Sequence, residues 1–381
     1  MKEKLILTNG NLMCARAAFA SGCRAAGVYP ITPSSEISDE LALLLPKAGY
    51  VFKQKEDEIA AIAFAAGCSM AGFKAMTITS GPGFALMSEF LGYLFMTEVP
   101  LVVINVMRGG PGTGLPTRPA QGDVLNARNP TPGDVRAIVL APGSALQCYS
   151  ETVRAFDLAE RFMQPIIILS DELVGHADCH VSVSDIENIQ TNTILRRQNP
   201  LDSYQPYGVK KDEPAILNPF FNGQQYHITG LHHDRTGFPT EDHILCQELI
   251  DRHFEKVNAH LDEIEHFETY KMDDADYFIV CYGSVALSAI NAIDRMREGK
   301  RPIKVGMFQP LTLWPSPEKR MFEIARDFPE ENILVVEMNK GQYRGEVERA
   351  MRNRPQVLLK ANGRPITPAE IETKIRSMHH G

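Results

Sequence analysis

The chain has 381 residues, more than a single hydrophobic core usually supports, so we expect two or three domains. Hydrophobic residues make up 44% and charged residues 23%, and the formal net charge is -8, which excludes the basic character typical of nucleic-acid-binding proteins. No apolar stretch reaches the roughly 18 to 20 residues of a membrane helix, and residues 1–5 lack a signal-peptide pattern, so we expect a cytoplasmic protein that does not contact a membrane.

Helical and strand patterns alternate over residues 1–190. These patterns predict helices at 11–26 (with Asn11 as a cap), 36–45, 58–71, 84–97 and 145–162, and strands at 25–29, 75–79, 101–107, 137–140 and 165–169. The run at 101–107 is largely apolar and β-branched, which is typical of a strand buried on both faces. This alternation predicts an α/β domain with a parallel sheet.

Residues 191–271 contain five prolines and few periodic apolar runs, so we interpret them as a connector and interface segment that ends in a helix at about 242–267. From residue 272 to residue 381 the α/β pattern returns. Strands are predicted at 277–282, 303–308 and 333–337, and helices at 284–297, 317–328 and 341–350. These elements predict a second, smaller α/β domain.

The cysteines and histidines do not form a metal-binding pattern. The seven cysteines are scattered and none lies in a Cys-x-x-Cys pair, which argues against a disulfide framework and against an iron–sulfur cluster held by this chain. His176 and His180 have helical i, i+4 spacing, but no glutamate follows His176 as it does in zinc proteases. We therefore predict no metal ligands in this chain.

Three polar residues at chain turns are candidates for a binding site. Glu58 begins an apolar helix, where burial would raise its pKa and suit it to sharing a proton; alternatively it is one of three ordinary acids in the run 56–58. Arg108 follows the buried strand, at the sheet edge where α/β folds bind ligands; alternatively it is a surface arginine in a flexible loop. Together with Thr32, these residues could line one cleft for a small anionic substrate.

The glycine-rich run 109–114 also raises the possibility of a nucleotide site. A dinucleotide-binding loop opens directly into a helix, whereas here Leu115-Pro116-Thr117-Arg118-Pro119 follows and cannot start a helix promptly. The chain also contains no Gly-x-x-x-x-Gly-Lys-Ser/Thr loop. The sequence therefore predicts neither a dinucleotide site nor a nucleoside-triphosphatase loop.

Four segments resemble the alpha subunits of 2-oxoacid:ferredoxin oxidoreductases. They are Gly27-Val28-Tyr29-Pro30-Ile31-Thr32-Pro33-Ser34-Ser35-Glu36, Glu56-Asp57-Glu58-Ile59-Ala60-Ala61, Thr79-Ser80-Gly81-Pro82-Gly83, and residues 107–117. The resemblance covers nearly the whole chain. Segments 129–134, 226–233 and 236–241 are similar to the 2-oxoglutarate branch of that family.

The resemblance implies a pyrimidine-type domain that binds thiamine diphosphate, followed by a smaller α/β domain like the C-terminal domain of transketolase. The diphosphate-binding half of such sites carries Gly-Asp-Gly with a later asparagine. Gly122-Asp123-Val124 and Gly133-Asp134-Val135 do not complete that pattern. The resemblance therefore implies that Mg2+ and the nearest 4Fe-4S cluster belong to a separate beta subunit, and that thiamine diphosphate is shared with it.

The resemblance also implies roles for individual residues. Glu58 would hydrogen-bond the aminopyrimidine ring, and Thr32 and Arg108 would hold the 1-carboxylate and carbonyl of the substrate. The further cofactor contacts implied are Pro30, Ile31, Ser80 and Gly81. For a second substrate carboxylate the candidates Lys53, Arg118 and the pair His232-His233 stay open.

The implied reaction is the oxidative decarboxylation of 2-oxoglutarate with coenzyme A to succinyl-CoA and CO2, with electrons passed to ferredoxin. About 28 residues precede the first motif, so we expect a separate gamma subunit and a ferredoxin-like delta subunit as well as the beta subunit. Two alternatives stay open. One is activity on pyruvate or a branched-chain 2-oxoacid, and the other is a noncatalytic assembly subunit. The missing diphosphate motif argues against a stand-alone transketolase-like enzyme.

Overall fold

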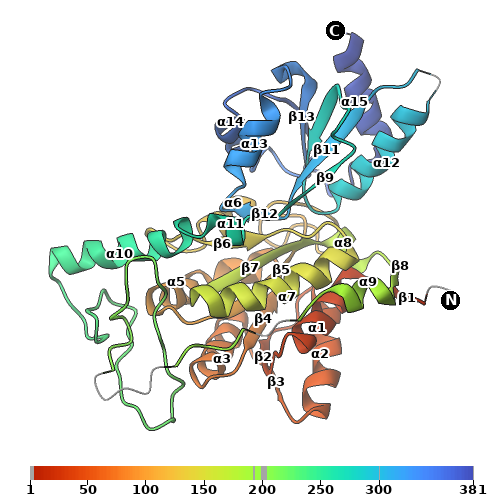
Figure 1. Ribbon diagram of the computed structural model, residues 1–381. Helices are drawn as coiled ribbons and strands as arrows, with labels where there is room; N and C mark the ends of the chain where they lie inside the picture. The colour runs from red at the N-terminus through yellow and green to blue at the C-terminus, as the bar shows by residue number, and fades with distance from the viewer. Residues whose placement is uncertain (1–3, 192–193, 199–203, 300, 381) are drawn as a thin grey trace.

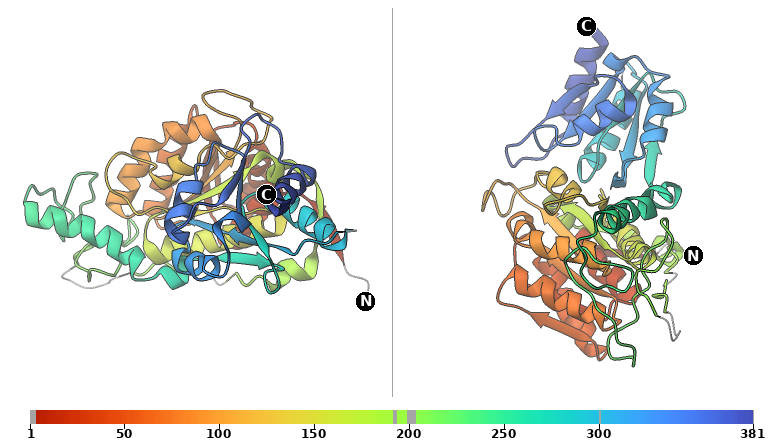
Figure 2. Two further views of the ribbon diagram at one scale, coloured as in Figure 1. Left: turned by 90° about the horizontal axis from the view of Figure 1, so that it is seen from above. Right: turned by 90° about the vertical axis from the view of Figure 1, so that its left-hand side faces the viewer.

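The computed structural model describes residues 4–191, 194–198, 204–299 and 301–380, which form two α/β bodies, one placed on an end of the other (Figures 1 and 2). The larger body contains a seven-stranded sheet in the order β12-β6-β7-β5-β4-β2-β3. The smaller body contains a five-stranded sheet in the order β14-β13-β10-β11-β9. The predicted α/β architecture with a second, smaller domain is confirmed.

Six strands of the large sheet run parallel, and one edge strand is antiparallel. The parallel strands are β2 (Ala25–Val28), β3 (Val51–Gln54), β4 (Ala75–Thr79), β5 (Leu101–Met107), β6 (Ile138–Leu140) and β7 (Pro165–Asp171). Strand β12 (Thr312–Trp314) comes from the C-terminal part of the chain and pairs antiparallel with β6. The predicted bounds of β4 and β5 are confirmed, and every residue of β5 is buried.

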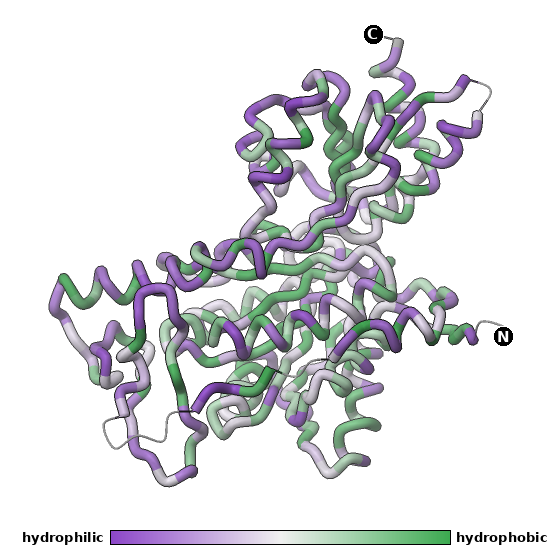
Figure 3. Tube along the Cα trace, in the orientation of Figure 1, coloured by the Kyte–Doolittle hydropathy of each residue, from purple (hydrophilic) through white to green (hydrophobic). Residues whose placement is uncertain are grey.

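Helices cover both faces of the large sheet. On one face lie α1 (Gly10–Ala20), α2 (Ser35–Lys47) and α7 (Ala145–Phe162), and on the other lie α3 (Glu58–Met70), α4 (Gly81–Leu86) and α5 (Ser88–Thr97). Val102 and Ile104 pack into the first layer, whereas Leu101 and Val103 pack into the second, as the two-residue period of a strand requires. In Figure 3 the central strands are accordingly hydrophobic.

Two predicted helices differ from those observed. The first ends at Ala20 rather than at residue 26, because Gly22 takes a left-handed φ of 88°, and its cap is Asn9, whose side chain accepts a hydrogen bond from the Leu12 amide. Asn11 instead lies inside the helix and donates to the carbonyl of Pro33. The helix predicted at 84–97 is two helices, α4 and α5, that meet at Met87.

Several short elements were not predicted. They are β1 (Leu5–Thr8) and β8 (Cys179–Ser182), which form an antiparallel pair, and the helices α6 (Val124–Arg128), α8 (Glu172–His176) and α9 (Val183–Asn188). Within the described part of the chain, no helix combines the length and apolar character needed to cross a membrane.

The connector crosses the amino edge of the large sheet. In its described residues between α9 and α10 there is no helix or strand. Phe220 donates its amide hydrogen to the carbonyl of Met70 at the end of α3 (2.9 Å), and Arg196 Nη2 donates to Ser69 Oγ (3.0 Å). Since α3 runs from the carboxyl edge to the amino edge, these contacts place the connector opposite the start of α3.

Helix α10 (His243–Asn258) is shorter than the predicted helix at 242–267. It is followed by α11 (Leu261–Ile264) and by β9 (Phe267–Tyr270), which pairs antiparallel with β11 in the small sheet. The prediction of one continuous helix is therefore wrong: α10 ends at Asn258, the short helix α11 follows, and strand pairing with the small sheet determines the conformation from Phe267. The domain limits at residues 190 and 271 stay predictions.

A buried ion cluster fixes α10 to the large sheet. Glu98 follows α5, is completely buried, and contacts three basic side chains of α10: Arg252, Lys256 (2.9 Å) and His253 (3.6 Å). Burial opposes its ionisation, but Arg252 and Lys256 together hold the pKa of the Glu98 carboxyl well below its usual range. The carboxylate also accepts the amide hydrogen of Ala215, so the connector is attached at the same point.

The small sheet has four parallel strands and the antiparallel strand β9. The parallel strands are β10 (Tyr277–Val280), β11 (Val305–Pro310), β13 (Ile333–Glu337) and β14 (Gln356–Leu359). Around them lie α12 (Val285–Glu298), α13 (Glu318–Ala325), α14 (Arg344–Met351) and α15 (Pro368–His380), with a short 3-10 turn at Glu330–Asn332. The two bodies meet at the end of β7, where Asp171 accepts the amide hydrogen of Ser284 (2.8 Å).

Candidate active site

The predicted site residues gather at the carboxyl edge of the large sheet. Thr32 follows β2, Glu58 follows β3, Ser80 and Gly81 follow β4, and Arg108 follows β5. The chain passes from β2 outward to β3 and then back across β2 to β4, so the strand order reverses at the boundary of β2 and β4. Open α/β sheets bind ligands at such a switch point, and the site residues surround it.

Glu58 is the first residue of α3, and it is only 4% exposed. The preceding residue, Asp57, caps the helix by accepting the amide hydrogen of Ala60. Burial raises the pKa of the Glu58 carboxyl, the negative charge of Asp57 raises it further, and Arg108 acts in the opposite direction. Glu58 is therefore not an ordinary solvated acid at a helix start, and its carboxyl retains a proton more readily than usual.

The first turn of α4, which follows β4, lies directly against this carboxyl. A side chain at Gly83 would place its Cβ 2.3 Å from Glu58 Oε1 and 2.3 Å from Thr79 Oγ1. Only glycine allows so close an approach of backbone and carboxyl. The absence of a side chain at Gly83 thus sets where the Glu58 carboxyl can lie.

Arg108 is a buried cation without an ion pair. It is 8% exposed, its Nη1 donates to the carbonyl of Thr32 (2.6 Å), and its buried Nε has no hydrogen-bond partner. No carboxylate of the described residues lies within ion-pair distance of it. The alternative of a flexible surface arginine is excluded, and the guanidinium remains available for an anionic ligand.

The other predicted contacts lie in the same loops. Pro30 and Thr32 are exposed after β2, and the carbonyl of Ile31 accepts hydrogen bonds from Ser34. The hydroxyl of Ser80 is completely buried and donates to the carbonyl of Val106 (2.8 Å). Its side chain is therefore engaged in holding the start of α4 to β5, which leaves the backbone at Gly81 to face a ligand.

The candidates for a second substrate carboxylate separate in space. Arg118 is exposed at the end of the loop that Arg108 begins, and Lys53 is exposed on the edge strand β3. The pair His232-His233 lies at the amino edge, where His233 Nε2 is 3.2 Å from the carbonyl oxygen of Met96. The histidine pair is therefore not brought together with Glu58 and Arg108.

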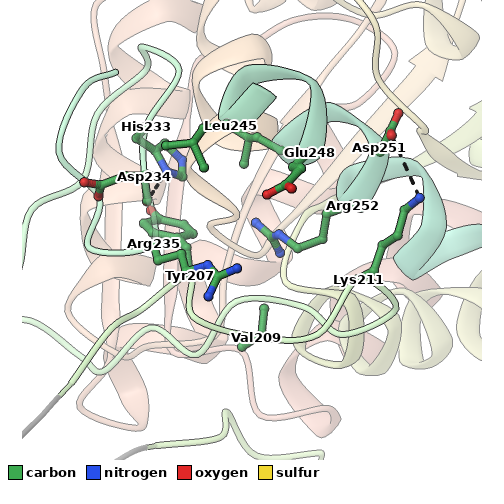
Figure 4. A pocket seen from close by; sticks show the side chains of 11 residues that line it. Tyr207, Val209, Lys211, His233, Asp234, Arg235, Leu245, Glu248, Asp251 and Arg252 are labelled. Atoms are coloured by element: carbon green, nitrogen blue, oxygen red, sulfur yellow. Dashed lines mark hydrogen bonds and ion pairs between the residues drawn. The ribbon is translucent and has the colours of Figure 1, made fainter. Parts of the chain in front are cut away.

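A cavity of about 370 Å³ also lies at the amino edge, between the connector and α10 (Figure 4). Part of its charged lining is paired, because Lys211 contacts Asp251 and Arg252 contacts Glu98. His233 lines this cavity, but Thr32, Glu58, Arg108 and the other candidates do not.

One residue of the carboxyl edge was not predicted. In the sequence, Asp123 is notable only as part of Gly122-Asp123-Val124, a tripeptide that does not complete the diphosphate-binding motif. In the structure its carboxyl lies against Gly81 and accepts a hydrogen bond from Asn105 Nδ2 (3.0 Å). Burial raises its pKa, whereas the Asn105 hydrogen bond and the charge of Arg108 lower it. No local pattern distinguishes Asp123 from the similar Asp134.

The described residues contain no group of three histidine, cysteine or acidic side chains placed to hold a metal ion. All seven cysteines lie in the described part of the chain and are free thiols.

Two family models match the chain. The model for "Pyruvate flavodoxin/ferredoxin oxidoreductase, thiamine diP-bdg" matches residues 16–249, and the model for "Pyruvate:ferredoxin oxidoreductase core domain II" matches residues 275–371. The first model thus contains every residue of the candidate site.

Two curated relatives match over nearly their full length. The chain is 40% identical over 376 residues to the 2-oxoglutarate synthase subunit KorA of Methanothermobacter marburgensis, with 97% of this chain and 98% of that protein covered. It is 31% identical over 375 residues to the ketoisovalerate oxidoreductase subunit VorB of the same organism, with 98% and 97% covered.

Among solved structures, the chain is similar to a 2-oxoglutarate:ferredoxin oxidoreductase from Magnetococcus marinus with 2-oxoglutarate, coenzyme A and succinyl-CoA bound. The TM-score is 0.92 at 32% identity, with 99% of this chain covered. The chain spans 65% of the length of that solved chain.

Proposed function

This chain belongs to the 2-oxoacid:ferredoxin oxidoreductase family, and we propose that it is the alpha subunit of a 2-oxoglutarate:ferredoxin oxidoreductase, which converts 2-oxoglutarate and coenzyme A to succinyl-CoA and CO2. The observation that carries the proposal is that two groups lie together at the switch point of a thiamine-diphosphate-binding domain. One is Glu58, a buried acid whose pKa is raised, and the other is Arg108, a buried cation without an ion-pair partner. One group suits a proton transfer, and the other suits a carboxylate substrate.

The residues present fit the aminopyrimidine end of thiamine diphosphate. Glu58 offers a carboxyl that can hold or donate a proton, and Gly83 leaves room for it. When bound, the cofactor supplies a carbon nucleophile for the 2-oxo group and an acceptor for the electron pair released by decarboxylation. The contribution of this chain is to position one carboxyl in a dry environment, where a shared proton is strongly held.

Arg108 and Thr32 act on the substrate. A guanidinium can bind a carboxylate with two parallel hydrogen bonds, and the free Nε edge of Arg108 is not engaged by protein. Its Nη1 bond to the Thr32 carbonyl orients the guanidinium across the end of β4. We propose that these two residues bind the 1-carboxylate and carbonyl of the 2-oxoacid.

For the second carboxylate of 2-oxoglutarate we propose Arg118. It lies in the same loop as Arg108 and is exposed, whereas the His232-His233 pair is at the opposite edge of the sheet. Arg118 would thereby favour a dicarboxylate over pyruvate or a branched-chain 2-oxoacid, because those acids have no second carboxylate for it to bind. An Arg118→Ala variant should lose 2-oxoglutarate activity more than it loses pyruvate activity.

The remaining parts of the reaction are proposed for other chains. We propose that a beta subunit carries Mg2+, the diphosphate-binding half and a 4Fe-4S cluster, and that gamma and ferredoxin-like delta subunits complete the complex. Coenzyme A is the acyl acceptor and ferredoxin the electron acceptor. Supporting this division, this chain carries no complete diphosphate motif and its relatives are named as subunits.

The proposal is tested by turnover of the native complex. The complex is purified through a tag on this chain, its partners are identified, and viologen reduction is measured with 2-oxoglutarate, pyruvate and 3-methyl-2-oxobutanoate in the presence of coenzyme A. We expect the highest kcat/KM with 2-oxoglutarate. An equal or higher value with 3-methyl-2-oxobutanoate would instead assign the chain to the branched-chain class, consistent with its 31% identity to the ketoisovalerate enzyme subunit.

A second measurement addresses the noncatalytic alternative. Calorimetric titration with thiamine diphosphate and Mg2+ should detect binding by the complex of this chain with its beta subunit, and none by this chain alone. Glu58→Gln in the complex should abolish most turnover. A complex that turns over at the wild-type rate with Glu58→Gln would identify this chain as an assembly subunit.

A further inference from the structure

Asp123 stands at the N-terminus of α6 without capping it. Its backbone carbonyl accepts the amide hydrogen of Ala127, but its side chain makes no capping hydrogen bond. Aspartate at this position normally caps the helix with its carboxylate. Here the carboxylate turns away from the helix and toward the carboxyl edge of the sheet.

The direction of this carboxylate is fixed by two contacts. Its Oδ2 accepts a hydrogen bond from Asn105 Nδ2 (3.0 Å), and its two oxygens lie 3.2 and 3.3 Å from the position that a Cβ on Gly81 would occupy. The carboxyl of Glu58 approaches the same turn of α4 at Gly83. The segment 81–83 therefore lies between two carboxyl groups.

The path of Arg108 passes beside Asp123. Asn105 on β5 pairs with Thr79 on β4, and Ser80 is hydrogen-bonded to Val106, so the start of α4 at Gly81 lies next to the end of β5. Strand β4 lies between β5 and β2, and Arg108 reaches from β5 to the carbonyl of Thr32 after β2. Its side chain must therefore cross the end of β4, where the Asp123 carboxylate lies against Gly81.

The small domain holds the backbone on both sides of Asp123. Gln342 donates from Nε2 to the carbonyl of Gly122 (2.7 Å) and accepts the amide hydrogen of Leu125 (3.1 Å). Gln121 donates its amide hydrogen to the carbonyl of Met338 (3.0 Å). Through these contacts the small domain positions the backbone around Asp123, although none of the predicted site residues belongs to the small domain.

We propose that Asp123 is a positioning residue of this active site, whose carboxylate holds the Arg108 guanidinium over the start of α4 at Gly81 and is itself placed by Gln342 of the small domain. The inference rests on the proposed function. A buried guanidinium without a contacting counter-ion requires negative charge nearby, and a carboxylate beyond contact distance supplies it without occupying the edge that binds substrate. The positive charge of Arg108 also acts to lower the pKa of both Asp123 and Glu58, so Arg108 interacts electrostatically with both acids.

Without the charge of Asp123, Glu58 is the remaining acid known to interact with Arg108, so the guanidinium would move toward it. Two consequences follow. Arg108 would bind the substrate less well, and its closer charge would lower the pKa of Glu58. A residue with a merely structural role would produce neither change in the pH profile.

The test is Asp123→Asn in the complete complex, compared with Asp134→Asn. Asp134 is an ideal control because it occupies the second Gly-Asp-Val tripeptide and is exposed. For Asp123→Asn we expect at least a tenfold loss of kcat/KM for the 2-oxoacid, and an acidic limb of the pH–rate profile displaced to lower pH. For Asp134→Asn we expect wild-type kinetics. Wild-type kinetics for both variants would overturn the proposal.

Two further measurements keep the test decisive. Gln342→Ala keeps the Asp123 carboxylate but removes the side chain that places it, so it should give a smaller loss of kcat/KM and a smaller displacement of the pH profile in the same direction, even if Asp123→Asn fails to assemble. A double-mutant cycle of Asp123→Asn with Arg108→Gln, measured by thermal unfolding of the complex, should be non-additive. This cycle needs no turnover, so additive values would refute the coupling, whereas absence of any 2-oxoacid activity in the wild-type complex would refute the proposed function alone.

Discussion

Gly83→Ala tests whether the position of the Glu58 carboxyl determines activity. An alanine Cβ at residue 83 would stand 2.3 Å from Glu58 Oε1, whereas ordinary contacts begin at 3.4 Å, so the carboxyl must move by about 1 Å. Glu58 Oε1 is the end of a flexible side chain, whereas Thr79 Oγ1, also 2.3 Å away, belongs to a buried strand, so the Glu58 carboxyl should move before the backbone does. A displacement of about 1 Å at a catalytic group costs roughly a hundredfold in rate.

The assay is viologen reduction by the purified complex, with thermal unfolding measured on the same samples. We expect turnover to fall about a hundredfold, while crowding at Thr79 and Glu58 costs about 1–3 kcal/mol of stability. Gly92→Ala is the matched control, because its Cβ would meet Thr131 Oγ1 at 2.4 Å and not Glu58.

The control should lose stability to a similar degree and keep its turnover per folded molecule. A Gly83→Ala complex with wild-type turnover would show that the carboxyl position is not critical, and would remove the basis for Glu58 as the proton-holding group. Equal losses of turnover in both variants would attribute the effect to crowding alone.

Three other substitutions and one pH effect follow from the same structure. Glu58→Gln should lower turnover by about 10²–10⁴-fold, the usual contribution of acid–base catalysis, with an unchanged unfolding midpoint. Arg108→Lys should raise the KM for the 2-oxoacid about tenfold, because an ammonium cannot offer the bidentate fork. Glu98→Gln should destabilise the chain by about 3–5 kcal/mol in urea unfolding, because it leaves buried cations of α10 unpaired. Burial lowers the pKa of His253 to about 4, below its ordinary 6.5, so its contribution to stability is complete above pH 6.5 and is lost as the pH falls toward 4. That loss amounts to about 3 kcal/mol, and His253→Gln should remove this part of the urea-unfolding pH dependence.

Long, strongly patterned elements could be predicted from local sequence. The bounds of β4, β5, α7 and β13 agree with the predicted ranges, because a continuous β-branched run or an amphipathic period over many residues has one stable arrangement. Four-residue strands such as β3, β9 and β14 were missed, because their conformation depends on a paired neighbour and not on their own composition.

The sequence by itself determined the parallel α/β design and, through its motifs, the family. It also predicted a common edge for Thr32 and Arg108, because each follows a predicted strand of a parallel sheet, whereas Glu58 joined them through the family resemblance, since β3 was not predicted. Only the tertiary structure decided which of several chemically similar residues lie at the carboxyl edge of the large sheet. It separates Asp123, turned toward Gly81, from the exposed Asp134, and it places His232 and His233 at the opposite edge. The physical reason is that burial and hydrogen-bond partners are set by segments distant in sequence, such as Gln342 and the connector, which no local pattern specifies.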